Sequence, residues 1–386
     1  MKRTLSICMV SFDFFPAQIG GQGIYAYEIC RGLASRGHDV HAIVSPTPER
    51  LWYYQEHKDF DVRFAGGKTP LLFGTNAYRQ FRRHYYEKNF DILHGNEVFT
   101  FWFAIRRPKN VDKVIAVCHN SYVERFNACH SIVKKPIYVP YMLMEKIMYS
   151  LVDDVIVGSE MEKEAVARYY GVNDSKLHMV YYGTNMEKFA LRDEGGNQMI
   201  RRNFGIKDDD VIVLFVGRLV ERKKPYLVLE AMREIVGRDP RFHCIFVGDG
   251  EYKEKLQKSA RQYDLVKNVH IVGAVEYDLL PQYYAASDIF VLPSEGEGGV
   301  SLVLLEAAAS GLPLIVSEDA SSHCPILGEG VNGYLVRSSN VSDIRDKILL
   351  VAKRAKAMGS ESRNIVNRHF TWGKCVEGTL EVYLRP

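Results

Sequence analysis

The sequence predicts an α/β protein built from two Rossmann-like domains whose parallel sheets face each other across a cleft. Short runs of β-branched residues alternate with helical patterns almost throughout the chain, which is typical of βαβ units. The alternation occurs twice, on either side of a segment at 186–210 that is rich in Asp, Glu, Gly and Asn. The chain of 386 residues is also long for one domain, so two or three domains are expected.

The expected strands fall into two series, and a helical pattern follows most of them. The first series lies at 5–10, 40–44, 91–93, 114–118 and 155–157, and the second at 211–216, 243–247, 269–272, 289–292 and 313–316. Helical patterns include 24–36, 161–170, 226–236, 252–263 and 302–310. We therefore place one domain at 1–190 and the other at 191–370. Ligands of such sheets bind at the carboxyl ends of the strands, so motifs at those ends are interpreted as functional.

The composition excludes several classes of protein. A net charge of only +3 argues against a global nucleic-acid-binding surface, and 47% apolar residues suit a globular protein. Seven scattered cysteines, odd in number and without a Cys-x-x-Cys pair, argue against a disulfide framework or a zinc site and favour a reducing cytosol. No apolar stretch reaches the roughly 18 residues of a spanning helix. We expect a cytoplasmic protein that is at most peripheral to a membrane, at its inner face.

The stretch at 293–313 carries the first candidate site. A Gly-rich loop, GEGG at 296–299, precedes a helical pattern that begins near Ser301 and contains Glu306. The free N–H groups of a helix start, here those near Ser301 and Leu302, together with the helix dipole, form a natural phosphate site. The alternative is a surface turn before an ordinary amphipathic helix.

Three further glycine-containing loops follow expected strands. GRLVERKKP at 217–225 contains Arg218 and Lys224, which are suited to stabilising a diphosphate; the alternative is a solvated basic loop. PAQIGGQG at 16–23 contains Gly20 and Gly21, where backbone can approach a ligand closely. GDGE at 248–251 begins with Gly248, which either approaches a nucleotide or belongs to a strand-to-helix turn with a helix cap.

Two histidines, His94 and His119, directly follow apolar strands. A lone histidine in this position is more often structural; we interpret His119 as functional and leave His94 open. The aspartates at 208–210 resemble an Asp-x-Asp metal clamp, but they precede their strand and are interpreted as a solvated loop. The Asn-Gly pair in VNGY at 331–334 predicts a hairpin turn.

Taken together, these motifs resemble the family 4 retaining glycosyltransferases of the GT-B fold. The resemblance spans nearly the whole chain in the family's order. It runs from FFPAQIGGQGIYAYEICRGLASRGHDV at 14–40 through GRLVERKKP, FVGDGE and VHIVGAVEYDLLPQYYAASDIFVLPS to SLVLLEAAASGLPLIVS, and ends with GVNGYLV and FTWGKCVEGTLEVYL.

The resemblance implies a role for each matching residue. Arg218 and Lys224 should hold the donor diphosphate, Glu306 the donor ribose, and the N–H groups near Ser301 and Leu302 the phosphates. Gly20 and Gly21 should approach the diphosphate from the first domain, and His119 should contact the donor sugar. The resemblance also implies that the last helix, 371–386, packs back on the first domain, and that a donor phosphate oxygen takes the acceptor's proton on the front face. No metal or other cofactor is expected, since the nucleotide sugar is a co-substrate.

The sequence departs from the family pattern at one glutamate. The family has two glutamates separated by seven residues, and counting back from Glu306 reaches Gly298. A one-residue insertion lets Glu297 take the first position, which is our prediction, with Glu295 as the alternative. The usual Lys-Gly reads Lys224-Pro225, and the usual strand-end pair of histidines reads His94-Gly95-Asn96.

The first domain should carry the acceptor. It contains the basic stretch with Arg79, Arg82 and Arg83 among aromatic residues, which suits an anionic membrane or a lipid diphosphate; the alternative is a solvated helix face. We therefore expect transfer of a hexose or N-acetylhexosamine from a nucleotide diphosphate sugar, with UDP or GDP as nucleotide, to a hydroxyl acceptor, lipid-linked or glycan. The rival functions are a nucleotide-sugar epimerase or hydrolase on the same fold, and a non-catalytic nucleotide-sugar-binding subunit.

Overall fold

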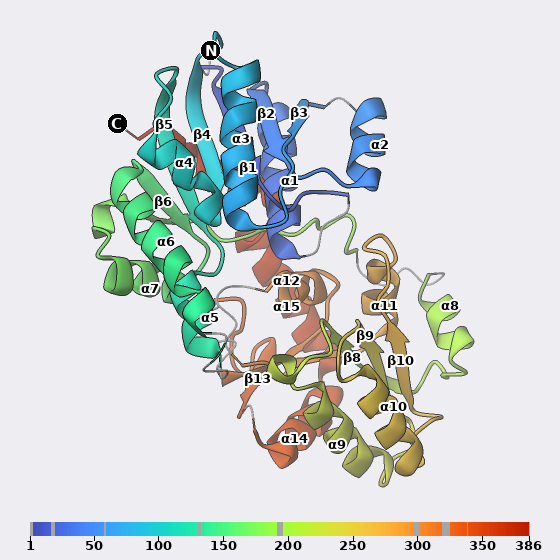
Figure 1. Cartoon of the computed structure of the whole chain (residues 1–386). Coiled ribbons are helices and arrows are strands. Elements are labelled where there is room, and N and C mark those ends of the chain that lie inside the picture. Colours follow the sequence, from blue (N-terminus) through green and yellow to red (C-terminus); the bar gives the residue numbers. More distant parts are fainter. Residues whose placement is uncertain are drawn as a thin grey trace. The chain divides into compact units, whose positions relative to one another are not determined.

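The computed structural model describes residues 3–16, 20–57, 59–129, 133, 135–190, 196–295, 301–318, 325–337 and 339–385. The chain forms two compact units, one comprising Met1–Gly183 with Trp372–Pro386 and the other Thr184–Thr371. The sequence placed this boundary at 190/191 and assigned the last helix to the first domain. Figure 1 shows both units as sheets flanked by helices. No helix in the described part of the chain combines the length and apolarity needed to cross a bilayer.

The first unit is built on a seven-stranded parallel sheet of strand order β3-β2-β1-β4-β5-β6-β7. Its strands are β1 (Ser6–Ser11), β2 (Asp39–Val44), β3 (Asp61–Phe64), β4 (Phe90–Asn96), β5 (Val111–Cys118), β6 (Asp154–Val157) and β7 (Leu177–Met179). The order reverses between β1 and β4, and this switch point is where doubly wound sheets bind ligands, beyond the carboxyl ends of the strands.

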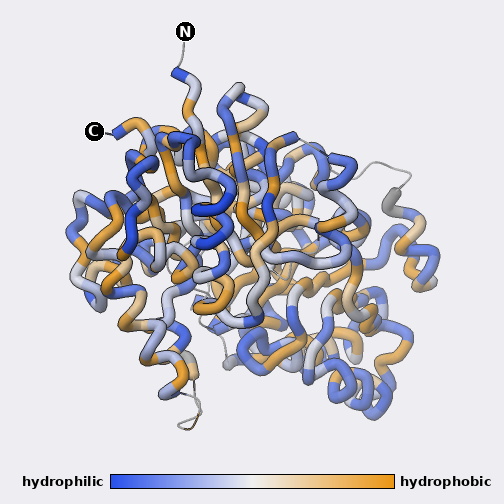
Figure 2. The backbone as a smooth tube through the Cα atoms, turned by 45° about the horizontal axis from the view of Figure 1, so that its top comes forward, coloured by the Kyte–Doolittle hydropathy of each residue, from blue (hydrophilic) through white to orange (hydrophobic). Residues whose placement is uncertain are grey.

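Helices cover both faces of this sheet. They are α1 (Gly21–Ala34), α2 (Pro48–Glu56), α3 (Pro70–His84), α4 (Phe101–Ile105), α5 (Tyr122–Ala128), α6 (Val139–Leu151), α7 (Glu160–Tyr170) and α16 (Trp372–Tyr383), with 3-10 turns η1 (Glu97–Thr100), η2 (Lys135–Ile137) and η3 (Asp174–Lys176). Figure 2 shows hydrophobic and hydrophilic residues interspersed along the chain, the pattern of elements that bury one side.

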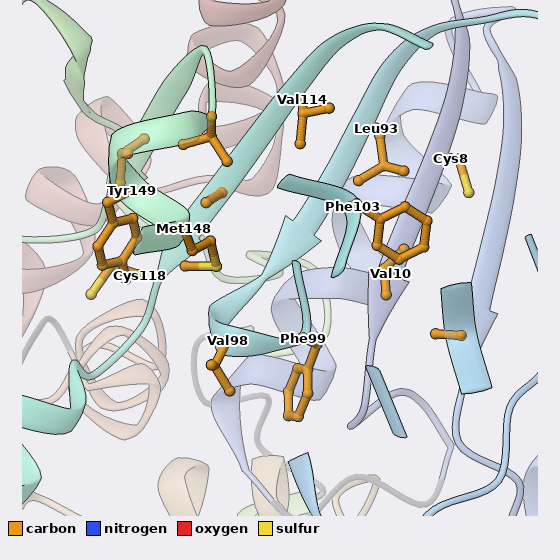
Figure 3. Close-up of a cluster of buried hydrophobic side chains, with 14 of the residues drawn as sticks. Cys8, Val10, Leu93, Val98, Phe99, Phe103, Val114, Cys118, Met148 and Tyr149 are labelled. Atoms are coloured by element: carbon orange, nitrogen blue, oxygen red, sulfur yellow. The ribbon is translucent and has the colours of Figure 1, made fainter. Parts of the chain in front are cut away.

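One core of the first unit lies between the sheet and the layer formed by α3, α4, α6 and α7. Figure 3 shows Val10 and Leu93 of the strands beside Phe103 of α4, and Met148 of α6 in the same cluster. On α1, Gly32 leaves room for α16, because a Cβ there would lie 2.5 Å from Cγ2 of Val376. The last helix therefore packs closely on α1, at a position where a larger residue would have to displace the Val376 side chain.

The second unit repeats the arrangement with a six-stranded parallel sheet of order β10-β9-β8-β11-β12-β13. Its strands are β8 (Val211–Val216), β9 (Phe242–Val247), β10 (Val269–Gly273), β11 (Ile289–Leu292), β12 (Leu314–Ser317) and β13 (Gly333–Val336). Its helices are α8 (Gly196–Asn203), α9 (Pro225–Val236), α10 (Lys253–Gln262), α11 (Leu280–Ala286), α12 (Leu302–Ala309), α14 (Val341–Ala352) and α15 (Ala355–His369), with the 3-10 turn η4 (Glu221–Lys223). The switch point of this sheet lies between β8 and β11.

The sequence missed β3, β7 and β13, which are short and contain polar residues. The hairpin predicted at 331–334 was wrong. The turn there leads into β13, which pairs with β12 in parallel. The Asn332 side chain instead fastens the turn, since its Nδ2 donates to the Ile326 carbonyl at 2.9 Å and its Oδ1 accepts from the Gly328 N–H at 2.7 Å.

Candidate functional site

The second unit places a basic loop at the switch point of its sheet. The strand β8 is wholly apolar, VIVLFV, and ends at Val216. Gly217 follows with a φ of 149° and turns the chain out of the sheet. Arg218 follows and is exposed, with no ion-pair partner among the described residues. Lys224 ends the loop in a left-handed conformation, φ 48° and ψ 46°, directly before Pro225 begins α9. A non-glycine residue in this conformation is an uncommon backbone arrangement, and such residues cluster at functional sites.

Lys224 joins this loop to the one that follows β11. Its Nζ forms an ion pair with the carboxylate of Glu295, and only 10% of the lysine side chain is exposed. The backbones are joined as well, since the Glu295 N–H donates to the Arg222 carbonyl at 2.9 Å. The ion pair therefore joins the two loops that flank the switch point. A bound diphosphate could interact with the same Lys224 ammonium group. Glu297, predicted as the first glutamate, lies outside the described residues, whereas the alternative Glu295 pairs with Lys224.

Glu306 is held inside the unit by hydroxyl groups. It lies on α12 and is 2% exposed, and the Tyr284 hydroxyl donates to its Oε2 at 2.9 Å. Burial raises the pKa of Glu306 to about 7, against the smaller lowering effects of hydrogen bonds from Tyr284 and Tyr277 and of the charge of Lys188. Nothing in the sequence marked these three neighbours. A carboxylate held in this way can accept hydrogen bonds from a diol such as a ribose.

The helix that carries Glu306 begins at Ser301, as predicted. Ser301 is the N-cap residue in an extended conformation, and its own side chain makes no capping hydrogen bond. The first turn contains no acidic residue, so the positive end of the helix dipole is not neutralised within it. Ser301 and Leu302 therefore present helix-start N–H groups of the kind that bind phosphate.

The backbone at Gly248 packs so closely on the backbone at Gly217 that only glycine fits. It follows β9 with a φ of 141°, and a Cβ on it would lie 1.9 Å from the Gly217 carbonyl oxygen. The same contact recurs two residues on, where a Cβ on Gly250 would lie 2.5 Å from the Leu219 carbonyl oxygen. Gly248 thus supports the loop that carries Arg218, and this packing accounts for the glycine independently of any nucleotide contact.

In the first unit, a buried ion pair holds the loop between β1 and α1. The Arg50 Nη2 donates to Asp13 Oδ1 at 2.8 Å, and the other carboxylate oxygen accepts from the Gly20 N–H at 3.1 Å. Arg50 is fully buried and also donates to the carbonyl of Phe14 at 2.8 Å. Gly20 is the extended N-cap of α1, and Gly21 is its first residue. Among the described residues, no atom lies within 4 Å of the position that a Cβ on Gly20 would take.

His119 follows β5 and is part of a partly buried hydrogen-bond network. Its Nε2 lies 2.7 Å from Asn96 Oδ1, and its Nδ1 bonds the Tyr182 hydroxyl. Because Asn96 Nδ2 donates to the Val10 carbonyl at 3.3 Å, Asn96 Oδ1 is the acceptor, so the proton of His119 is on Nε2. Burial, assisted by electrostatic interaction with His94 and Arg125, lowers the pKa of His119 to about 3. The ring is therefore neutral, and both nitrogens are engaged within the unit.

His94 has the structural role that a lone strand-end histidine usually has. It is fully buried, and its Nδ1 lies 2.7 Å from the hydroxyl of Tyr383 on α16. Burial lowers its pKa to about 3. His94 thus fastens the returning helix to the sheet. Asn96, which closes the same motif in this chain, is the residue that orients His119.

A second ion pair at the carboxyl edge of this sheet was not predicted. Glu97 directly follows β4 with a φ of 51°, and its Oε1 accepts from Arg125 Nη2 at 2.6 Å. A capping box places Arg125, because Ser121 and Glu124 begin α5 with reciprocal hydrogen bonds. The pattern Ser-x-x-Glu in the sequence could have indicated this helix, but nothing there indicated that Glu97 and Arg125 meet.

The predicted basic residues Arg79, Arg82 and Arg83 meet in one place. Together with Thr75, Tyr78, Trp102 and Arg106, they line a cavity of about 630 Å³ on the first unit. Arg106 stacks on the Trp102 ring, with Cζ 5.3 Å from its centroid. Among the described residues, no three or more His, Cys, Asp or Glu side chains form a group that could hold a metal ion.

Two family models match the chain, one in each half. The model described as Glycosyltransferase Family 4 matches residues 19–188, and the model described as Glycosyl transferases group 1 matches residues 197–366. The first match includes Gly20, Gly21 and His119, and the second includes Arg218, Lys224 and Glu306.

Similar proteins match over most of their length. The chain is 24% identical to an uncharacterized glycosyltransferase of Methanocaldococcus jannaschii, covering 98% of both chains. It is 27% identical to the UDP-Gal:alpha-D-GlcNAc-diphosphoundecaprenol alpha-1,3-galactosyltransferase of Escherichia coli, covering 77% of this chain and 76% of the other. It is also 24% identical to a D-inositol 3-phosphate glycosyltransferase of Geodermatophilus obscurus, covering 94% of this chain and 84% of the other.

Solved structures share the fold over the whole chain. The sucrose-phosphate synthase of Thermosynechococcus elongatus superposes with a TM-score of 0.82 at 21% identity, covering 99% of this chain and 98% of the other. HepE of Anabaena in complex with UDP-glucose superposes with a TM-score of 0.75 at 17% identity, covering 98% and 99%.

Proposed function

The chain belongs to the family 4 glycosyltransferases and has their GT-B fold, and on this premise we propose that it moves a hexose or an N-acetylhexosamine from a nucleotide diphosphate sugar to a hydroxyl acceptor. The observation that carries the proposal is the grouping at the second sheet's switch point. There, Lys224 and the loop after β11 are joined, and the helix that follows this loop carries the buried Glu306.

The donor half of the proposal rests on charge. The leaving nucleotide diphosphate gains negative charge in the transition state, and Arg218, Lys224 and the start of α12 supply fixed positive charge. The buried carboxylate of Glu306 suits a ribose diol. The E. coli relative's name gives UDP-Gal as its donor, and HepE was solved with UDP-glucose. Both support a nucleotide diphosphate sugar, of UDP or GDP type, as the donor here.

We propose a retaining, metal-independent reaction. Arg218, Lys224 and the start of α12 then stabilise the charge of the leaving diphosphate, as a metal cation does in other transferases. A donor phosphate oxygen takes the acceptor's proton on the front face. His119 is neutral, so it acts in this scheme as a hydrogen-bonding group beside the sugar. It contacts the sugar through a ring nitrogen only if it exchanges its bond to Asn96 or Tyr182.

For the acceptor, we propose a hydroxyl on a lipid-linked or glycan intermediate, bound by the first unit. The E. coli relative's name gives an acceptor linked to diphosphoundecaprenol. The basic cavity containing Arg79, Arg82 and Arg83 suits a phosphate-bearing partner. With free cysteines throughout its described part, the protein suits the cytoplasm, at the inner face of the membrane.

Donor binding is tested first, by thermal shift against UDP, GDP, ADP and CMP sugars. Donor turnover is then measured with and without an acceptor panel. Transfer that requires an acceptor supports the proposal; turnover without any acceptor indicates an epimerase or hydrolase, and binding without turnover a non-catalytic subunit. Lys224→Ala should lower kcat/KM about 100-fold or more. Lys258→Ala, on the exposed side of α10, is the matched control and should leave the rate unchanged.

A further inference from the structure

Three neighbouring helices of the first unit form one layer with one outward side. α4 packs against both α3 and α6, and all three contribute to the same core on one face of the sheet. Figure 3 shows the inward side of this layer, where Phe103 of α4 and Met148 and Tyr149 of α6 point into the core. The opposite sides of the three helices therefore all point away from this core, on the same side of the sheet.

The outward side of α6 is an apolar stripe. Val139, Leu143, Ile147 and Leu151 recur every four residues, which places them in one row along the helix. Their exposed fractions range from 38% for Ile147 to 59% for Leu143. Ile137, in the turn before α6, is 61% exposed. A row of large apolar side chains in water is costly and marks a surface that meets an apolar partner.

The charge on the same layer is positive. α3 and α4 contain no acidic residue, and the single acid of α6, Glu145, is 1% exposed. The cations include the four arginines of the cavity between α3 and α4, Lys146 on α6, and Arg107, which is paired with Asp153. Trp102 and Tyr78 form part of the cavity wall, so the layer combines cations, amphipathic aromatic rings and an apolar row.

We propose that the outward side of α3, α4 and α6, the docking face, lies on an anionic phospholipid bilayer. The apolar row of α6 enters the boundary between headgroups and acyl chains, and Arg79, Arg82, Arg83 and Arg106 bind headgroup phosphates. An amphipathic helix with cations beside its apolar row binds membranes in this way. This proposal rests on the proposed attachment to the membrane and assigns that attachment to the docking face. Vesicle binding tests it independently, because it can be measured without sugar transfer.

The docking face fits other partners less well. A symmetric dimer through this face would bring two sets of cations together with no unpaired acid on the face to neutralise them. Nucleic acid would use the cations but leave the apolar row of α6 in water. An anionic bilayer satisfies both the charge and the apolar surface.

The experiment is sedimentation of the full chain with phosphatidylcholine vesicles and with vesicles containing phosphatidylglycerol. We expect binding to the anionic vesicles only. The triple variant Arg79→Glu, Arg82→Glu, Arg83→Glu should weaken it by more than about 100-fold, since each basic residue near such a surface contributes about fivefold. Its control, Lys255→Glu, Lys258→Glu, Arg261→Glu on α10, makes the same change in net charge and should bind normally.

A second pair of variants tests the apolar row. Val139→Glu with Leu143→Glu should weaken vesicle binding at least about tenfold, and folding should tolerate both because the residues are exposed and near the start of α6. Val266→Glu with Leu279→Glu is the matched control on the second unit, at similarly exposed positions. Absence of vesicle binding, or equal losses in variants and controls, would overturn the proposal. Dissociation of a dimer by the α6 variant in light scattering would assign the face to a second copy instead. Each variant should keep the thermal shift that a nucleotide sugar gives the wild type. A loss of vesicle binding with this shift retained therefore concerns the docking face and not the proposed function.

Discussion

Replacing Glu306 with glutamine should make the unliganded protein more resistant to unfolding at alkaline pH, relative to wild type, than at acid pH. Burial raises the pKa of Glu306 from 4.5 to about 7. The folded protein therefore holds a proton that the unfolded chain has lost between these two pH values. Stability contributed by protonated Glu306 is complete below pH 4.5 and falls as the pH rises through 7. The variant keeps the shape of the side chain and removes this dependence.

The size of the effect follows from the two pKa values. The interval from 4.5 to about 7 corresponds to about 3 kcal/mol at 1.36 kcal/mol per pH unit, and about 2.5 kcal/mol of it falls between pH 5 and 8. The constant cost of burying an amide is the same at both pH values, so it cancels from the comparison. For a unit the size of Thr184–Thr371, the difference corresponds to about 5–10 °C in Tm.

The assay is urea unfolding of wild type and Glu306→Gln at pH 5, 6, 7 and 8. The difference in free energy of unfolding between them should shift by about 2–3 kcal/mol in favour of the variant across this range. Parallel pH profiles would refute the reasoning that Glu306 titrates inside the folded unit. Donor affinity of the wild type should rise across the same interval, because a ribose diol donates hydrogen bonds to the ionised carboxylate.

Three further substitutions test packing. Gly248→Ala should lower the free energy of unfolding in urea by about 2–4 kcal/mol, because Gly248 has a positive φ and its new Cβ would overlap the Gly217 carbonyl oxygen. Gly171→Ala, at a positive φ but with no described atom within 4 Å of the new Cβ, should lower it by only about 1 kcal/mol. Arg50→Met should lower the free energy of unfolding by about 3–5 kcal/mol at pH 7, because it removes the ion pair that the buried Asp13 makes with Arg50. Gly32→Leu should separate α16 from α1 and expose α16 to limited proteolysis, while Lys258→Ala should not.

The sequence predicted the fold well, because the strong strands are wholly apolar and are separated by helices of regular period. The strands β8 and β11 were placed at their observed bounds for this reason. The strand β3, DVRF, lies at the edge of its sheet and alternates polar with apolar residues over four positions only, so it was missed. β13 was mistaken for the second strand of a hairpin because an Asn-Gly pair gives no information about which strand the chain joins next.

The candidate site was predictable in part. Lys224 and Glu306 were named as candidates because their motifs follow strands and occur in the family's order. Their partners were not, because Lys188 and Tyr284 reach Glu306 from other segments of the chain, through contacts that no local pattern records. The ion pair of Glu97 with Arg125 was missed for the same reason. Sequence motifs thus indicate candidate ligand-binding residues more readily than the residues that set their charge and orientation.

The ion pair of Lys224 with Glu295 permits a decision on the first glutamate of the family's pair. If Glu295 only occupies the place of the diphosphate, Glu295→Gln frees Lys224 and should tighten binding of the nucleoside diphosphate about three- to tenfold, with kcat little changed. If Glu295 instead contacts the donor sugar, the same variant should lower kcat by about 100-fold, and Glu297→Gln should be nearly silent. We expect the first outcome for Glu295 and a large loss of kcat for Glu297→Gln. Calorimetry with the nucleoside diphosphate and steady-state kinetics on both variants distinguish the two, and a large loss of kcat in Glu295→Gln alone would show that Glu295 is the motif's first glutamate.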